Sequence, residues 1–239
     1  MVFPATPEGE PMAPPLALDI DGTLTTPEHT IAPRAFSLLA EWEAPVVLAT
    51  GKAFPYPVAL CQFAGIPERV IAENGGVALA EGDLRYAGDP ERVAAAVEAF
   101  EERGGDLGWN DVDTINRWRE TEVAARRTAD EELLREIAAA FDLDFVDSGY
   151  AYHLKSPGVS KGSALAGVAD TLGYDTADFV AVGDSENDVS TFEVVEESYA
   201  VANADESARR AADHVLDRGY VDGTLDALRA VREREKGQE

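Results

Sequence analysis

Hydrophobic and polar positions follow two alternating patterns along the chain. Short, continuous apolar runs that end in polar residues or glycine indicate strands buried on both faces. Between these runs, apolar residues recur every three to four positions, which indicates amphipathic helices. Strands and helices that alternate in this way predict an α/β fold, with a parallel sheet covered on both faces. The expected strands are 15–20, 45–50, 69–76, 178–184 and 198–203, and the expected helices are 32–43, 54–66, 160–174, 186–196 and 205–212.

The middle of the chain departs from this order. Two helical patterns, 89–103 and 129–141, are interleaved with strand-like segments. This order predicts a small α+β cap domain inserted into a Rossmann-like core domain. The expected boundaries are 82–156 for the cap domain and 15–81 with 157–239 for the core domain, and the expected strands of the cap are 121–127, 142–147 and 150–155.

The N-terminal segment, residues 1–14, is rich in proline and is expected to be a disordered lead. It lacks the basic start and the apolar stretch of a secretory signal. Met12 stands just before the first expected strand, so Met1 and Met12 are both candidate translation starts. No apolar run in the sequence reaches the roughly 18 to 20 residues that a membrane-spanning helix needs, so we expect no membrane partner.

Charge is the strongest signal in the composition. Acidic residues outnumber basic residues by 46 to 20, which gives a formal net charge of −26. Self-repulsion of this size disfavours a compact state in dilute salt and is screened by concentrated salt, so we expect a salt-adapted protein of the halophilic type. The same charge argues against a nucleic-acid partner. The single cysteine, Cys61, excludes an intramolecular disulfide and fits a reducing cytoplasm.

Candidate chemistry lies where the expected strands end. Asp19 and Asp21 close the first strand and share one of its faces, about 6 to 7 Å apart, where two carboxylates repel each other. A bound cation, or a reaction that uses both acids, would offset this repulsion. The ligand crevice of an open α/β sheet lies beyond the carboxyl ends of its strands. The other polar residues expected in this crevice are Thr50, Gly51, Lys161, Asp184, Ser185, Asn187 and Asp188.

This set of residues suits phosphoryl transfer. Hard oxygen ligands in this number favour Mg²⁺, which also binds a substrate phosphate. Asp19 would attack phosphorus to form an aspartyl-phosphate, and Asp21 would protonate the leaving oxygen and later accept a proton from water. Thr50 and Lys161 would stabilise charge on the transferred group. The expected substrate is therefore a small phosphorylated metabolite.

Four segments resemble the motifs of the haloacid-dehalogenase superfamily of phosphatases, in the expected order: DIDGTLT, LATGK, SKGSAL and VGDSENDVSTF. The resemblance implies that Asp19 is nucleophile and Mg²⁺ ligand, and that Asp21 is general acid and base with its backbone carbonyl on the metal. Asp184 and Asp188 would complete the metal site. The substrate-binding residues would be Thr50, Gly51, Lys161 and Asn187. Lys52 stands where arginine or asparagine is commoner in the superfamily, which leaves its role open.

The inserted segment resembles the α/β cap of the sugar-phosphatase branch, and its shortness resembles the archaeal phosphoglycolate phosphatases. The resemblance implies hydrolysis of 2-phosphoglycolate to glycolate and phosphate, by a monomer or a homodimer. A phosphatase of the sucrose-phosphate or mannosyl-3-phosphoglycerate type is an alternative, because the cap sets which leaving group fits. A phosphomutase is another. A non-enzymatic alternative is a receiver-like phosphoacceptor module, since receivers also use aspartate, Mg²⁺, threonine and lysine.

Other polar and aromatic residues have simpler interpretations. Asn74 and the two glycines after it are typical of a tight turn, although they could also line the crevice. The histidines, among them His153, are scattered and are interpreted as surface or packing residues. Trp109 and Trp118 lie in the insert and could contact the substrate, but both are interpreted as packing residues of the cap.

Overall fold

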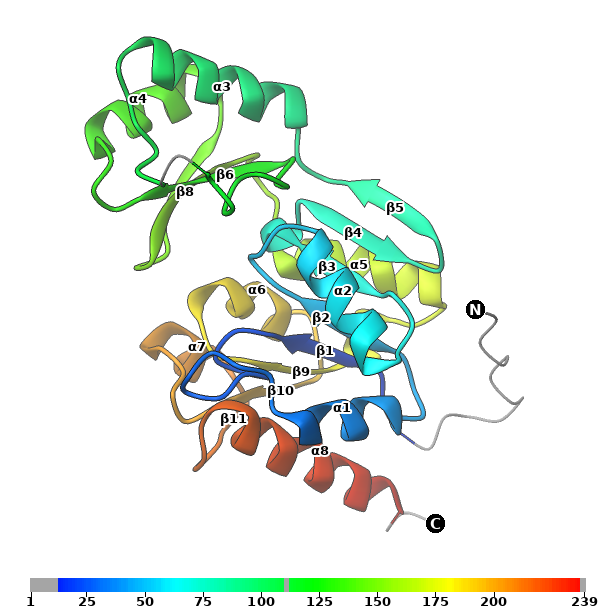
Figure 1. Cartoon of the computed structure of the whole chain (residues 1–239). Coiled ribbons are helices and arrows are strands. Elements are labelled where there is room, and N and C mark those ends of the chain that lie inside the picture. The colour runs from blue at the N-terminus through cyan, green and yellow to red at the C-terminus, as the bar shows by residue number, and fades with distance from the viewer. Residues whose placement is uncertain (1–12, 110–111, 237–239) are drawn as a thin grey trace.

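A computed structural model describes residues 13–109 and 112–236 of the chain (Figure 1). The choice between Met1 and Met12 as the start, and most of the expected lead 1–14, lie outside these residues. Within them, the structure consists of a core domain with one sheet and a smaller cap domain with a second sheet. The α/β architecture expected from the sequence, with an inserted α+β unit, is confirmed.

The core domain is built on a mixed sheet of eight strands. In spatial order they are β11 (His214–Val215), β10 (Glu197–Ala200), β9 (Val180–Gly183), β1 (Leu16–Asp19), β2 (Val46–Ala49), β3 (Val70–Ala72), β4 (Val77–Ala80) and β5 (Asp83–Tyr86). The central strand β1 runs parallel to both of its neighbours, β2 and β9. All residues of these three strands are buried, which accounts for the continuous apolar runs in the sequence.

The helices of the core domain form two groups. One contains α1 (Pro33–Ala40), α2 (Pro55–Ala64) and α8 (Tyr220–Lys236), and the other contains α5 (Lys161–Leu172), α6 (Val189–Phe192) and α7 (Glu206–Ala211). The chain moves from β1 outward to β3 on one side and from β9 outward to β11 on the other. Because connections between parallel strands are right-handed, the two groups cover opposite faces of the sheet. Among the described residues, no helix is long and apolar enough to cross a membrane.

The cap domain has its own sheet and its own hydrophobic core. Its elements are α3 (Pro90–Glu102), β6 (Glu122–Arg126), α4 (Glu131–Ala140), β7 (Asp144–Asp147) and β8 (Ala151–Lys155). Strand β8 pairs antiparallel with β6 on one side and β7 on the other, and α3 and α4 pack together over this sheet. Phe100, Leu134 and Leu154 are fully buried here, in a cluster separate from the core of the larger domain.

The structure differs from the expected elements at several places. The expected strand 69–76 ends at Ala72, where a 3₁₀ turn begins. Strands β4 and β5 form an antiparallel hairpin at the edge of the large sheet, so residues 83–86 pair with the core domain, whereas we expected the cap to begin at 82. The apolar pattern did not indicate β5 because all of its residues are exposed. The expected helix 186–196 is reduced to the four residues of α6 after a 3₁₀ turn. The 3₁₀ turns are η1 (Glu73–Gly75), η2 (Thr176–Asp178) and η3 (Glu186–Asp188).

Candidate active site

The ends of three parallel strands bring polar residues to one edge of the large sheet. Asp19 ends β1, Thr50 follows β2 and Asp184 follows β9. The register pairs Asp19 with Ala49, the residue before Thr50, and β9 lies in register on the other side of β1. The chain order reverses at β1, which is the position where open α/β sheets bind ligands.

Lys161 reaches this edge from the first turn of α5. Its Nζ lies 2.8 Å from Asp19 Oδ1 and 2.7 Å from Asp188 Oδ1, and its side chain is fully buried. Ser160 fixes the start of α5, because its hydroxyl accepts a hydrogen bond from a backbone N–H in the first turn. Gly75, at φ +103°, lets this turn come close, since a Cβ at that position would collide with the Ser160 carbonyl oxygen.

Asp19, Lys161, Asp184 and Asp188, here called the core cluster, place three carboxylates around one ammonium group. Burial and the charges of the other aspartates raise the pKa of Asp19 well above its usual value, against the opposing effect of Lys161. Burial and the Asp188 charge raise the pKa of Asp184 to about 7. Burial alone would lower the pKa of Lys161, but the two carboxylates beside it raise that pKa. Three ionised carboxylates would exceed the single positive charge of Lys161, so the cluster favours the addition of further positive charge.

One oxygen of the core cluster stands out. Asp19 Oδ2 is buried, and no hydrogen-bond donor within the described residues reaches it. Asp19, Asp184 and Asp188 each offer one carboxylate oxygen, and these oxygens lie within 4.8 Å of one another. Hard oxygen donors with surplus negative charge suit a divalent cation. These residues therefore fit a divalent metal ion.

Asp184 and Asp188 have different surroundings. Asp188 is buried, and its Oδ2 accepts hydrogen bonds from the backbone N–H groups of Asp184 and Ser185 at 2.9 and 3.1 Å, which holds the loop after β9. Asp184 faces the cavity. Gly22, at φ +82°, lets the turn after β1 approach it, because a Cβ there would collide with the Asp184 carboxylate. Asp184 is thus the more accessible of the two to a ligand.

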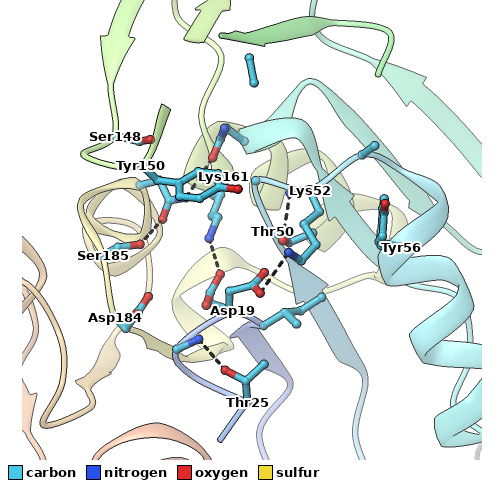
Figure 2. A pocket seen from close by; sticks show the side chains of 18 of the residues that line it. Asp19, Thr25, Thr50, Lys52, Tyr56, Ser148, Tyr150, Lys161, Asp184 and Ser185 are labelled. Carbon is cyan, nitrogen blue, oxygen red and sulfur yellow. Dashed lines mark hydrogen bonds and ion pairs between the residues drawn. The ribbon is translucent and has the colours of Figure 1, made fainter. Parts of the chain in front are cut away.

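The loops after β1 and β2 bring Asp21, Thr50 and Lys52 together, and Figure 2 shows Thr50 next to Lys52. Thr50 is buried, and its Oγ1 accepts a hydrogen bond from the backbone N–H of Lys52 at 3.1 Å. Lys52 Nζ lies 3.1 Å from Asp21 Oδ1, and both side chains are partly exposed. Lys52, whose role the sequence leaves open, is therefore the charged partner of the expected general acid.

A cavity of about 1210 Å³ opens beyond this edge, between the core and the cap. Figure 2 shows Ser148 and Tyr150 of the cap across this space from Asp19. Except for Asp188, which lies buried beside Lys161, the site residues expected from the sequence all line the cavity. They are Asp19, Asp21, Thr50, Gly51, Lys161, Asp184 and Asn187.

Comparison with known proteins agrees with this arrangement. The model of the haloacid dehalogenase-like hydrolase family matches two segments, residues 16–116 and 111–228, which together span most of the chain. The chain belongs to the haloacid dehalogenase-like hydrolase family. The resemblance seen in the four sequence motifs is therefore confirmed. Because the family model matches both halves of the chain, the receiver-like alternative is excluded.

Members of this family from archaea are close in sequence. A phosphoglycolate phosphatase of Halorubrum lacusprofundi is 62% identical over 225 residues, which is 93% of this chain and 99% of the relative. A phosphoglycolate phosphatase of Halobacterium salinarum is 54% identical over 219 residues, which is 92% of this chain and 97% of the relative. A crystal structure of a Thermoplasma acidophilum protein superposes with a TM-score of 0.77 at 26% identity and covers 92% of this chain and 98% of that one.

A second group of buried charges joins the cap to the core beside the family motifs. We call Asn74, Arg119, Glu122 and His153 the interface cluster. Glu122, at the start of β6, pairs with Arg119 through Oε1 and accepts a hydrogen bond from Asn74 Nδ2 through Oε2 at 2.8 Å. His153 Nδ1 lies 3.5 Å from Glu122 Oε1. Burial alone would raise the pKa of Glu122, but Arg119, His153 and Asn74 together outweigh burial and lower the pKa to about 2.

The interface cluster contacts two of the expected substrate-binding residues. Arg119 Nη2 donates to the Gly51 carbonyl oxygen at 2.8 Å, and Asn187 Nδ2 donates to Asn74 Oδ1 at 3.0 Å. Asn74 has φ +54° and lines the cavity, so both interpretations of this residue hold. Sequence reasoning missed Arg119 and Glu122. The available signal was a glutamate at the start of a strand-like segment, three positions after an arginine, where an apolar residue is more usual.

The tryptophans of the insert have different roles. Trp109 Nε1 donates to the Ala124 carbonyl oxygen within the cap, as a packing residue would. Trp118 is 48% exposed and makes an edge contact with Tyr56 of α2, with ring centroids 6.4 Å apart. The interpretation of Trp118 as a packing residue of the cap interior is therefore wrong, because its ring bridges cap and core.

Proposed function

We propose that the protein is a Mg²⁺-dependent phosphatase that hydrolyses 2-phosphoglycolate to glycolate and phosphate. The observation that carries this proposal is the buried Asp19. One of its oxygens has no hydrogen-bond partner among residues 13–109 and 112–236, and the Lys161 ammonium group lies 2.8 Å from the other. A nucleophile that attacks an anionic phosphate needs an available oxygen next to positive charge. The choice of substrate is supported by the name that both archaeal relatives carry.

The proposed reaction has two displacements at phosphorus. Asp19 Oδ2 attacks phosphorus, so a bond forms between them while the bond from phosphorus to the glycolate oxygen breaks. Asp21 gives its proton to that oxygen, and glycolate leaves. Asp21 then takes a proton from a water molecule, whose oxygen attacks the aspartyl-phosphate. The bond from phosphorus to Asp19 breaks, and inorganic phosphate is released with the carboxylate restored.

The remaining residues bind and orient the phosphate. Lys161 supplies a compact cation for the phosphoryl oxygens, and Thr50 supplies a hydroxyl donor. We propose that Gly51 and Asn187, which line the same wall, position the substrate. Because Arg119 of the cap holds the Gly51 carbonyl, the position of this wall depends on the cap as well as on the core.

The proposed metal ligands are Asp19, Asp184, Asp188 and the backbone carbonyl of Asp21. Mg²⁺ bound there supplies positive charge that offsets the repulsion between the Asp19 carboxylate and the incoming phosphate. In the protein alone, burial raises the pKa of Asp19, so the ionised nucleophile is disfavoured until positive charge is added beside it.

The cavity supports a second candidate function. Its volume, about 1210 Å³, is far larger than a two-carbon phosphate ester, so the larger leaving group of a sugar phosphate also has room. A sugar phosphatase would use the same aspartyl-phosphate chemistry and differ only in the leaving group. A phosphomutase would pass the phosphate from Asp19 to a second sugar hydroxyl in place of water.

A substrate panel tests the proposal. Phosphate release is measured in molar KCl with Mg²⁺, from 2-phosphoglycolate, several sugar phosphates, ethyl phosphate and an aryl phosphate. We expect the highest kcat/KM with 2-phosphoglycolate. A preference for a sugar phosphate would transfer the same mechanism to the second candidate, and no release from any ester would overturn both.

We also propose that the enzyme works in the cytoplasm as a monomer or homodimer, without a nucleic-acid partner. The net charge of −26 and the buried thiol of Cys61, whose pKa burial raises to about 11, support this setting. Size-exclusion chromatography with light scattering in molar KCl measures the oligomeric state, and a tetramer or larger assembly would contradict it.

A further inference from the structure

The walls of the cavity carry several carboxylates, which repel an anionic substrate, and its volume exceeds that of a small substrate. A small substrate with a phosphate and a carboxylate brings negative charge into a space whose walls are already acidic. Size alone does not select such a substrate in a cavity of about 1210 Å³, and a cation that pairs with the carboxylate would supply the selection. The acidic residues of the described lining are Asp19, Asp21, Asp184, Glu186 and Asp205.

Among the described residues, four lysines and arginines line the cavity, and three of them already have fixed partners. Lys161 lies between Asp19 and Asp188, and its side chain is fully buried. Arg119 is 8% exposed and is divided between Glu122 and the Gly51 carbonyl oxygen. Lys155 Nζ donates to the Val159 carbonyl oxygen at 2.6 Å. Moving any of these groups away from its present partners to reach a substrate carboxylate would break a buried or short contact.

Lys52 is the fourth, and its surroundings differ. Its Nζ lies 3.1 Å from Asp21, with side chains 44% and 40% exposed, so the pair is well solvated and contributes little to stability. Its backbone N–H is bonded to Thr50 Oγ1, which anchors its base beside the proposed phosphate site. The Tyr56 ring lies 6.0 Å from Nζ on the outer side. The head group can therefore change partners while the backbone stays fixed.

We propose that Lys52 binds the carboxylate of the substrate and exchanges its ion pair with Asp21 for one with that group. This inference rests on the proposed function, since it assumes a substrate with a carboxylate close to the phosphate. In a two-carbon ester the two charged groups are only a few bonds apart, so a cation two residues after Thr50 is within reach of the second group when Thr50 contacts the first. The exchange also leaves Asp21 without its partner as the leaving oxygen arrives beside it.

The test compares two esters that differ only in the carboxylate, 2-phosphoglycolate and ethyl phosphate. We expect Lys52→Gln to lower the ratio of their kcat/KM values by about 10- to 100-fold, mainly through a higher KM for 2-phosphoglycolate. Lys52→Arg keeps the positive charge, so its preference for 2-phosphoglycolate over ethyl phosphate in kcat/KM should be closer to that of the wild type. If the glutamine variant loses activity equally on both esters, Lys52 acts on Asp21 or on the loop, and the inference is overturned.

The matched control is Lys155→Gln, which removes a cavity lysine that is bonded to a backbone carbonyl. This variant should keep the wild-type ratio of kcat/KM for 2-phosphoglycolate to kcat/KM for ethyl phosphate. Inhibition constants test binding without the chemical step. 3-Phosphonopropionate is an unhydrolysable isostere of 2-phosphoglycolate, and propylphosphonate is the matching isostere of ethyl phosphate. The first should inhibit the wild type more strongly than the second, and Lys52→Gln should abolish that difference.

The wild-type ratio separates the two proposals. If the wild type itself does not prefer 2-phosphoglycolate to ethyl phosphate, the proposed function fails and this inference fails with it. If the wild type prefers 2-phosphoglycolate and Lys52→Gln keeps that preference, only the role of Lys52 is overturned.

Discussion

The core cluster and the interface cluster are both buried groups of charges, but they are balanced differently. In the interface cluster each oxygen of Glu122 has a partner, Arg119 or Asn74, and the pKa of Glu122 is lowered to about 2. In the core cluster one buried oxygen of Asp19 has no hydrogen-bond partner within the part of the chain that the structure describes, and the pKa of Asp19 is raised. Removing charged groups from water is costly in both places, yet only the Glu122 carboxylate has both of its oxygens partnered by other side chains, although His153 Nδ1 beside it has no hydrogen-bond partner among the described residues.

This difference separates a structural charge group from one that awaits a ligand. A satisfied pair fixes geometry, here the position of the cap against Gly51 and Asn74. An unsatisfied group has free energy to gain from a cation or from a substrate that completes it. The following predictions test that distinction, beginning with the largest effect.

Asp19→Asn is expected to lower kcat by on the order of 10⁴-fold or more, because the amide cannot form the aspartyl-phosphate. The variant should remain folded and no less stable at neutral pH, since the raised pKa means that the native state disfavours the ionised carboxylate. Phosphate release and thermal unfolding, measured side by side with Asp83→Asn on the exposed strand β5, check both parts. Near-normal turnover would exclude Asp19 as the nucleophile.

Removal of the divalent metal should abolish the phosphatase activity. EDTA is expected to abolish phosphate release, and excess Mg²⁺ to restore it, because the core cluster lacks the positive charge that its carboxylates need. Mg²⁺ should also raise the melting temperature of the wild type and raise that of Asp19→Asn less. Full activity in metal-free buffer would refute the metal site.

Lys161→Ala is expected to lower kcat/KM by about 10² to 10³-fold, with losses in both phosphate binding and rate. The variant also leaves Asp19 and Asp188 buried without their shared cation, so it should unfold at lower denaturant concentration. Steady-state kinetics and equilibrium unfolding measure the two effects, and Lys155→Ala serves as the control. A variant with normal kinetics would remove Lys161 from the phosphate site.

Glu122→Gln should affect stability more than chemistry. It leaves the Arg119 guanidinium buried without a counter-charge, which is expected to cost about 3 to 5 kcal/mol in the free energy of unfolding. The pKa of Glu122 in the folded state is lowered from 4.5 to about 2. The wild type therefore has its full extra free energy of unfolding above pH 4.5, and loses it as the pH falls toward 2.

Denaturant titrations of the wild type and Glu122→Gln at pH 7, 4.5 and 3.5, in molar KCl, measure this difference. The difference in the free energy of unfolding between the two proteins should be smallest at pH 3.5. Glu98→Gln, at an exposed position of α3, should change little at any pH. A constant gap would mean that the charge of Glu122 is not what stabilises the interface.

The sequence determined the parts of this protein that depend on local patterns. The apolar runs of β1, β2 and β9 identify buried strands, and the polar residues that follow each run are encoded next to it. Parallel strands bring such ends to one edge, so Asp19, Thr50 and Asp184 could be assigned to one site without coordinates. The surplus of acidic residues is likewise a property of composition alone.

Tertiary structure decided what depends on residues far apart in the chain. Lys161 meets Asp19 across 142 positions, and Asn74 meets Glu122 across 48. The exposed β5 joins the large sheet through pairing that its own residues do not signal, and Lys52 becomes the partner of Asp21 only when two loops converge. Such pairings are fixed by how distant elements pack together, because an isolated charge or an exposed strand carries no local signal of its partner.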